Sequence, residues 1–106
     1  MPLVKIFAMR GTSPMPTAAL QRALCSVWGT QPSVTKLMVC LLDDWTTSGE
    51  DVFVDIRAKQ TADRTRETVA RKVAEVQQVF AQHGYKANVR VETYQAEQYF
   101  HLPPPS

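Results

Sequence analysis

The apolar positions of the chain fall into four short runs that have the character of β-strands. These runs are rich in valine, isoleucine and phenylalanine, and polar turns or glycines separate them. In the third run apolar and polar residues alternate, whereas the second is apolar on both faces, which predicts a buried central strand. The predicted strands are Leu3–Met9, Val34–Leu42, Asp51–Arg57 and Tyr85–Tyr94.

Between the two strands of each pair, apolar residues recur every three or four positions, as they do in an amphipathic helix. The first helix is expected to follow Ser13, which can cap exposed N–H groups, and to end at Gly29. The second is expected to open at Thr61 and to end at Gly84. Their apolar stripes are Leu20, Leu24, Val27 and Trp28 in the first, and Val69, Val73, Val76 and Phe80 in the second.

The predicted order, strand-helix-strand, occurs twice, and the two halves are alike in detail. Residues 2–12 can be laid on residues 51–61, with a basic residue two positions before a threonine in each. We therefore predict one domain spanning 1–106, with two repeats at about 2–46 and 51–100 and an extended tail at 101–106. The strands of each repeat should be parallel. Any two strand-helix-strand units share much of this pattern. The alternative that the two halves are unrelated units therefore stays open.

Length and composition exclude several classes of protein. The 106 residues carry 44% apolar side chains, too many for a disordered chain, and a formal charge of +2 without a dense basic block, which argues against nucleic-acid binding. The longest apolar run, Leu37–Leu42, is far shorter than the roughly 20 residues of a membrane-spanning helix. Cys25 and Cys40 cannot build a disulfide framework or a zinc site, so we expect a cytoplasmic protein without a metal.

Pro2 is the most informative single residue. Removal of Met1 would leave a secondary amine at the start of the first strand. An α-amino group normally titrates at about 7.7–8, and apolar surroundings or neighbouring cations lower that pKa. Such an amine would be unprotonated near neutral pH, as a general base must be. A Met-Pro start without any function is the competing interpretation.

The Met-Pro start, the basic-Gly-Thr turn at 10–12 and the Pro-Ser-Val-Thr-Lys segment at 32–36, within a pattern repeated once, resemble the tautomerase superfamily. That superfamily includes 4-oxalocrotonate tautomerase, malonate semialdehyde decarboxylase and macrophage migration inhibitory factor. The resemblance covers the chain up to about Phe100 and implies an α+β fold of two β-α-β units, with a four-stranded mixed sheet and two helices on one face. It also implies a catalytic amine at Pro2, a trimer and no cofactor.

The resemblance extends to the cations that would hold a 2-oxo acid. Arg57 and Lys59 resemble the basic pair of the decarboxylase-like members and would act with Pro2 in catalysis. Lys36 and Arg90 resemble the arginine that binds substrate on the return strand of 4-oxalocrotonate tautomerase. Where that enzyme has an arginine after the first-strand glycine, this chain has Thr12, which argues against the classical muconate substrates.

Aromatic residues that follow the return strands are candidate pocket walls. Trp45 and Phe100 are the predicted substrate contacts, and Tyr94 and Tyr99 lie close to the second of these in the sequence. Acidic residues could activate water, as in the hydrating members of the superfamily, but the sequence does not choose among Asp43, Asp44, Asp55 and Glu92.

The sequence therefore predicts a trimeric, cofactor-independent tautomerase or isomerase that acts on a small enolisable 2-oxo acid, with decarboxylation and hydration as variants. Two alternatives stay open at this point. One is a non-catalytic binding or assembly protein of the same fold. The other is a monomeric ferredoxin-like domain, which has the same order of elements and an antiparallel sheet.

Overall fold

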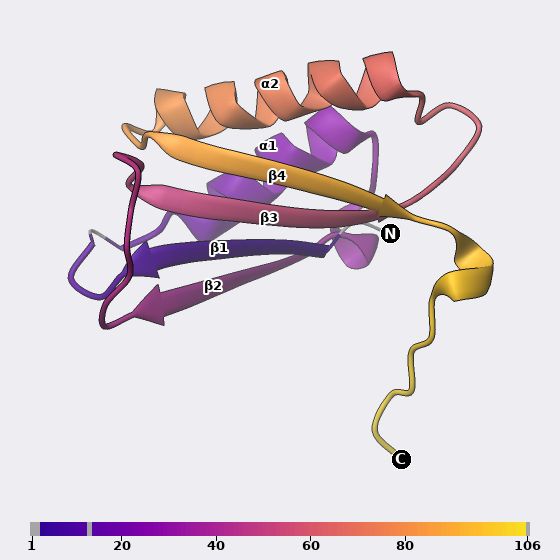
Figure 1. Cartoon of the computed structure of the whole chain (residues 1–106), viewed down its shortest axis with the longest axis horizontal. Coiled ribbons are helices and arrows are strands. Elements are labelled where there is room, and N and C mark those ends of the chain that lie inside the picture. Colours follow the sequence, from indigo (N-terminus) through magenta and orange to yellow (C-terminus); the bar gives the residue numbers. More distant parts are fainter. Residues whose placement is uncertain (1–2, 13, 106) are drawn as a thin grey trace.

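The computed structural model describes residues 3–12 and 14–105 and shows a four-stranded sheet with two helices (Figure 1). The elements follow one another as strand, helix, strand, strand, helix, strand, with two short 3-10 helices. They are β1 (Leu3–Met9), α1 (Thr17–Trp28), η1 (Pro32–Val34), β2 (Lys36–Leu42), β3 (Val52–Lys59), α2 (Arg66–Gln82), β4 (Ala87–Tyr94) and η2 (Ala96–Gln98).

The sheet has the strand order β2-β1-β3-β4. β1 pairs with β2 in parallel, β3 pairs with β4 in parallel, and the antiparallel pairing of β1 with β3 joins the two halves. This mixed sheet confirms the predicted fold class and the parallel strands of each repeat. Its two parallel pairs also exclude the fully antiparallel sheet that the ferredoxin-like alternative requires.

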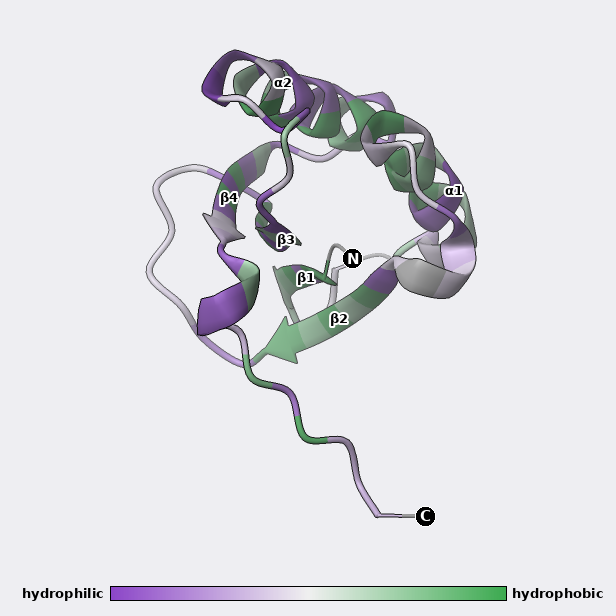
Figure 2. Cartoon of the chain, turned by 90° about the vertical axis from the view of Figure 1, so that its right-hand side faces the viewer, coloured by the Kyte–Doolittle hydropathy of each residue, from purple (hydrophilic) through white to green (hydrophobic). Residues whose placement is uncertain are grey.

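Both helices cover the same face of the sheet, and the core lies between them and the two central strands (Figure 2). Ile6 and Val54 face each other across the junction of the halves, and both are completely buried. Burying such a side chain contributes about 1.5–3 kcal/mol to folding. The remaining fully buried side chains of these layers are Val4, Ala8, Leu20, Leu24, Val52, Ile56, Ala58, Val76 and Phe80.

The structure corrects the predicted start of the second helix. Thr65, not Thr61, caps α2, because its side-chain oxygen accepts a hydrogen bond from the backbone N–H of Thr68 (3.2 Å). Thr61 instead donates to Asp63 (2.6 Å) in the loop before the helix. Gly29 closes α1 in the left-handed conformation (φ 65°), as predicted. Ser13, the predicted cap of α1, lies outside the described residues.

The prediction of a buried central position for the second strand is wrong. β2 is an edge strand, and Met38 and Leu41, which point to opposite faces, are each nearly half exposed. Its apolar residues alternate between the helix-covered face, where Leu37 and Val39 reach the core, and the open face. A run that is apolar on both faces therefore does not identify a central strand here.

The register of the predicted repeat is also wrong, by one residue. Laying residues 2–12 on 51–61 matches Val4 with Phe53, but Val4 faces the helices and Phe53 faces the open side. A shift of one residue exchanges the two faces of a strand. The buried positions of β1 match those of β3 only when the offset between them is an even number of residues.

Trp28, the last residue of α1, lies buried between the two helices and the loop after β3. The guanidinium carbon of Arg64 and the Nζ atom of Lys72 lie 5.7 and 5.6 Å from the centre of its ring. Lys72 also donates a hydrogen bond to the carbonyl of Val27 (2.7 Å), which satisfies a free group at the C-terminus of α1. Within the described part of the chain, the indole N–H of Trp28 has no hydrogen-bond partner.

The C-terminal tail leaves the sheet on the side opposite the helices (Figures 1 and 2). After η2 it runs away from the body of the protein, and the side chains of Phe100 and Leu102 are 89% and 94% exposed. Among residues 3–12 and 14–105, no helix is both long and apolar enough to cross a membrane.

Candidate active site

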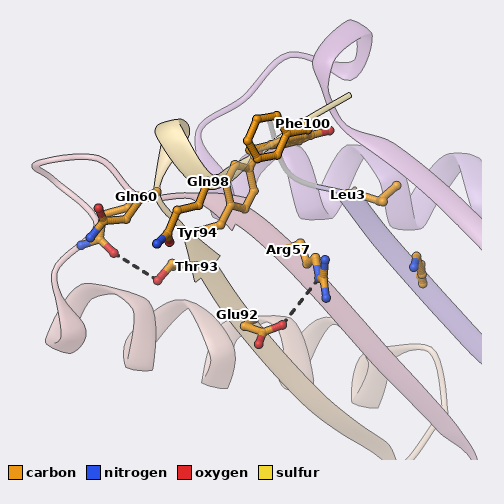
Figure 3. A pocket seen from close by; sticks show the side chains of 11 residues that line it. Leu3, Arg57, Gln60, Glu92, Thr93, Tyr94, Gln98 and Phe100 are labelled. Carbon is orange, nitrogen blue, oxygen red and sulfur yellow. Dashed lines mark hydrogen bonds and ion pairs between the residues drawn. The ribbon is translucent and has the colours of Figure 1, made fainter. Parts of the chain in front are cut away.

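A pocket of about 770 Å³ lies at the end of the sheet where β1 begins and where β3 and β4 end (Figure 3). Its walls come from three strands and from the segment that contains η2. The lining side chains are Leu3, Lys5, Arg57, Gln60, Glu92, Thr93, Tyr94, Gln95, Gln98, Tyr99 and Phe100.

The strand register brings the charged residues of the pocket together. Leu3 pairs with Arg57, and Arg57 pairs with Glu92, so these three residues form one row across β1, β3 and β4. Lys5 lies two residues after Leu3 and therefore on the same face of β1. This is the open face, opposite the helices, because Val4 between them is buried in the core.

Arg57 and Glu92 interact weakly at the floor of the pocket. The Nε atom of Arg57 lies 3.5 Å from a carboxylate oxygen of Glu92, and both side chains are 64% exposed. An exposed pair of this kind contributes roughly 0–1 kcal/mol. The guanidinium of Arg57 is therefore free to take a second, better-aligned carboxylate.

Neutral polar groups line the far end of the pocket. The backbone N–H of Gln60 donates to the carbonyl of Tyr94 (2.7 Å), and the hydroxyl of Thr93 donates to the side-chain oxygen of Gln60 (3.2 Å). Arg64 donates to the carbonyl of Lys59 and so fastens the loop that follows β3. Gln98, on η2, lies beside Tyr94 in Figure 3.

Aromatic side chains form the outer wall. The rings of Tyr94 and Tyr99 meet edge to face with their centres 4.6 Å apart, a geometry that aromatic pairs favour. Tyr99 follows the 3-10 turn of η2, and its contact with Tyr94 places it at the end of β4. Phe100 follows and borders the pocket, although most of its ring faces solvent.

Asp55 and Arg90 form the best-aligned ion pair on the open face. The two guanidinium nitrogens of Arg90 lie 3.1 Å from the two carboxylate oxygens of Asp55, whose side chain is 14% exposed. The hydrogen bonds from Arg90 hold the pKa of Asp55 below its usual value. The same bonds raise the pKa of Arg90, and its guanidinium also lies 5.4 Å from the ring centre of Phe53.

The pocket lining includes two residues predicted to act in catalysis or substrate binding, Arg57 and Phe100. It also includes the aromatic candidates Tyr94 and Tyr99 and the acidic candidate Glu92. Lys36 is exposed and pairs with Leu3 on the opposite side from Arg57, so it neighbours a lining residue without being part of the lining. Pro2 lies outside the described residues. It is bonded to Leu3, the first residue of β1.

The other predicted site residues lie elsewhere within this chain. Lys59 is exposed at the end of β3 and is not part of the lining. Arg90 is engaged with Asp55, one row away from Arg57. Trp45 follows β2, at the end of the sheet opposite to the pocket, because β2 runs parallel to β1. These assignments stay predictions.

Several lining residues were not singled out by sequence reasoning. Lys5 carries a recognisable signal, because a charged residue interrupts an otherwise apolar strand two positions after its start. Gln60 and Gln98 carry none, since neutral amides after a strand resemble ordinary surface residues. Within the ranges 3–12 and 14–105, no three His, Cys, Asp or Glu side chains gather as metal ligands would.

The sequence matches no family model and no curated protein. The structure is similar to a fused 4-oxalocrotonate tautomerase (4-OT) described as an asymmetric trimer, at 14% identity and a TM-score of 0.68, over 94% of this chain and 91% of that one.

Two further solved structures, of proteins with different names, are also similar to this chain. The FG41 malonate semialdehyde decarboxylase inhibited by 3-bromopropiolate has 17% identity and a TM-score of 0.65, over 92% of this chain and 87% of that one. Macrophage migration inhibitory factor of Toxoplasma gondii has 15% identity and a TM-score of 0.62, over 93% and 95%. At these identities the comparison confirms the tautomerase-superfamily resemblance as a likeness of fold.

Proposed function

We propose that this protein is a cofactor-independent tautomerase-type enzyme in which Pro2, freed by removal of Met1, moves a proton on a small enolisable 2-oxo acid. One observation carries the proposal: the pocket begins at Leu3, the residue bonded to Pro2, and Arg57 is the neighbour of Leu3 in the sheet. The residue bonded to the proposed amine therefore pairs with a cation suited to a carboxylate.

The proposed reaction follows from the charges around that amine. Arg57 and Lys5 attract the substrate carboxylate and stabilise the negative charge that develops on the enolate oxygen. The amine of Pro2 takes the proton of the enol hydroxyl and returns it to the neighbouring carbon. A C=O bond replaces the C=C bond, and the amine ends unprotonated, as it began.

The same cations favour the unprotonated amine. Positive charge nearby and the aromatic wall both disfavour an ammonium ion at Pro2 and lower its pKa toward the working pH. Lys59 and Lys36, exposed near this end of the sheet, are the further cations proposed to support binding, and Arg90 contributes through its pair with Asp55.

We also propose that the chain assembles with copies of itself, as a trimer. The structurally similar fused 4-OT is described as a trimer. In this chain Met38, Phe100 and Leu102 expose large apolar side chains on the edge strand and on the tail, where a second copy could cover them. Light scattering on the purified protein tests this directly, and a monomeric mass would contradict it.

The decisive experiment changes Pro2 itself. We expect Pro2→Ala to lower the rate of phenylenolpyruvate ketonisation about 100-fold or more, since positioned acid-base groups contribute roughly 10²–10⁴. Pro103→Ala, a matched proline change in the exposed tail, should leave the rate unchanged. Mass spectrometry of the intact chain should show that Met1 is absent. Retained methionine, or an unchanged rate in Pro2→Ala, would contradict the proposal and favour a binding protein of this fold.

A further inference from the structure

Four charged side chains form a square on the open face of the sheet, beside the pocket. Asp55 and Arg57 are two residues apart in β3 and share that face, and Arg90 and Glu92 do the same in β4. The register pairs Asp55 with Arg90 and Arg57 with Glu92. Each carboxylate therefore has one arginine beside it on its own strand and another on the neighbouring strand.

The two carboxylates are held very differently in this square. Asp55 accepts two hydrogen bonds of 3.1 Å from Arg90, whereas Glu92 lies 3.5 Å from a single nitrogen of Arg57 (Figure 3). Glu92 also acts on Arg90. The hydrogen bonds to Asp55 and, to a smaller extent, the negative charge of Glu92 raise the pKa of Arg90.

Both carboxylates can compete with a ligand for Arg57. Arg57 lines the pocket, and in the proposed function it takes the carboxylate of the ligand. After the hydrogen bonds from Arg90, the charge of Arg57 also lowers the pKa of Asp55, so Asp55 without Arg90 would turn to Arg57. Glu92 already meets Arg57, and the carboxylate of a ligand would repel it.

The guanidinium of Arg90 can hold both carboxylates at once. A guanidinium carries five N–H groups, and Arg90 uses only Nε and Nη2 for Asp55. Its Nη1 atom has no hydrogen-bond partner in the described part of the chain, and Glu92 lies two residues along the same face of β4. The guanidinium carbon lies 5.4 Å from the ring centre of Phe53, and Arg90 is not part of the pocket lining.

We propose, building on the function above, that Arg90 is a positioning residue that keeps the carboxylates of Asp55 and Glu92 away from Arg57. It holds Asp55 at all times, and it receives Glu92 when the carboxylate of a ligand displaces Glu92 from Arg57. Arg90 does not touch the ligand, and it acts on binding through Arg57.

Isothermal titration calorimetry with phenylpyruvate at low salt tests the proposal. Arg90→Gln should weaken binding about tenfold, because the released carboxylates then pair with Arg57. In the background Asp55→Asn with Glu92→Gln no carboxylate is left to compete, so adding Arg90→Gln there should change the Kd by about twofold or less. Arg71→Gln, which removes an exposed arginine of α2, should also stay within about twofold.

A tenfold loss that persists in the neutralised background would overturn the proposal, because Arg90 would then contact the ligand or only support the fold. Unchanged binding in Arg90→Gln would overturn it as well. If Arg90→Gln leaves Asp55 unpaired and does not fold, Asp55→Asn with Arg90→Gln takes its place. That variant should bind about fivefold more weakly than Asp55→Asn alone, and Glu92→Gln should reduce the difference to about twofold or less.

The readout separates this inference from the proposed function. Binding is measured without turnover, and Pro2→Ala leaves the four charges in place, so the effect of Arg90→Gln should persist in that variant. A protein that loses turnover in Pro2→Ala but binds equally well with Arg90→Gln would refute only the role of Arg90. A protein whose rate ignores Pro2→Ala but whose binding depends on Arg90 as described would refute only the reaction.

Discussion

At one end of the sheet β1 begins beside the C-terminal ends of β3 and β4, and at the opposite end β3 begins beside the C-terminal ends of β1 and β2. The two ends are thus equivalent in topology. Each has an exposed arginine with an acidic neighbour: Arg57 with Glu92 at the pocket end, and Arg10 with Asp43 at the other.

The two arginines differ in the quality of their pairing and in their surroundings. Arg10 lies 2.7 Å from Asp43, whereas Arg57 is 3.5 Å from Glu92 and lines the large pocket. β3 follows a loop from β2, whereas Leu3, the first residue of β1, is bonded to Pro2. The two ends of the duplicated fold are therefore similar, and the chemistry proposed for Pro2 concerns only the end where β1 begins.

Replacing each of the two arginines by alanine gives the largest expected difference in kcat/KM between the two ends of the sheet. Arg57→Ala should lower kcat/KM for phenylenolpyruvate about 100-fold, because it removes the donor to the carboxylate and to the enolate. Arg10→Ala, whose side chain is equally exposed at 64%, should stay within about twofold. Steady-state kinetics measures both. Similar losses in the two variants would mean that the ends do not differ in function.

Two acidic residues that pair with arginines, Asp55 with Arg90 and Asp43 with Arg10, should differ in their contribution to stability. Asp55→Asn should lower the free energy of unfolding by about 1–2 kcal/mol, since Asp55 is largely buried and holds Arg90 by two charged hydrogen bonds. Asp43→Asn, at the opposite end and 84% exposed, should change it by less than about 0.5 kcal/mol. Urea denaturation compares the two variants.

The ion pair of Asp55 with Arg90 makes the stability of the protein depend on pH with a defined sign. The pKa of Asp55 is lower in the folded protein than in the unfolded chain, so its contribution is complete above about pH 4. That contribution is lost as the pH falls through the folded-state pKa. Wild type should therefore lose more stability than Asp55→Asn between pH 5 and pH 2 (roughly). Parallel pH profiles for the two proteins would contradict this account.

The smallest expected effect concerns the wall of the pocket. Phe100→Ala should weaken phenylpyruvate binding about threefold, because the ring borders the pocket but is mostly exposed. Leu102→Ala removes a similarly exposed apolar side chain that does not line the pocket, and it should leave affinity unchanged. Calorimetry distinguishes them, and equal losses would indicate that the tail acts as a whole.

Local patterns were sufficient to predict the elements, but not their place in the sheet. The helical stripes that end in Trp28 and Phe80 are buried in part: Leu20, Leu24, Trp28, Val76 and Phe80 are buried as their spacing predicts, whereas Val27, Val69 and Val73 are half-buried. The position of β2 was missed because the order of strands depends on pairing between distant segments. The open face also carries Phe7 and Phe53, so apolar residues on two faces do not mean burial on two sides.

The candidate site was predictable in its aromatic wall and in part of its charged residues, but not in its neutral polar ones. Arg57 interrupts an apolar alternation and has a visible reason to be near a ligand. Gln60, Thr93 and Gln98 enter the site because β3 and β4 end together and η2 directly follows β4. Nothing local in the sequence distinguishes such amides from ordinary surface residues, and only the assembled topology brings them together.

The environment of Trp28 makes this side chain an intrinsic fluorescent probe of the protein. Trp28 and Trp45 are its two tryptophans; the first is 4% exposed, whereas the second lies half-buried in a loop. Arg64 contacts the Trp28 ring and also holds the carbonyl of Lys59, at the edge of the pocket. A movement of that edge shifts the charge of Arg64 beside the indole. We therefore expect the fluorescence of Trp28, on the helix-covered side of the sheet, to change when the edge of the pocket moves.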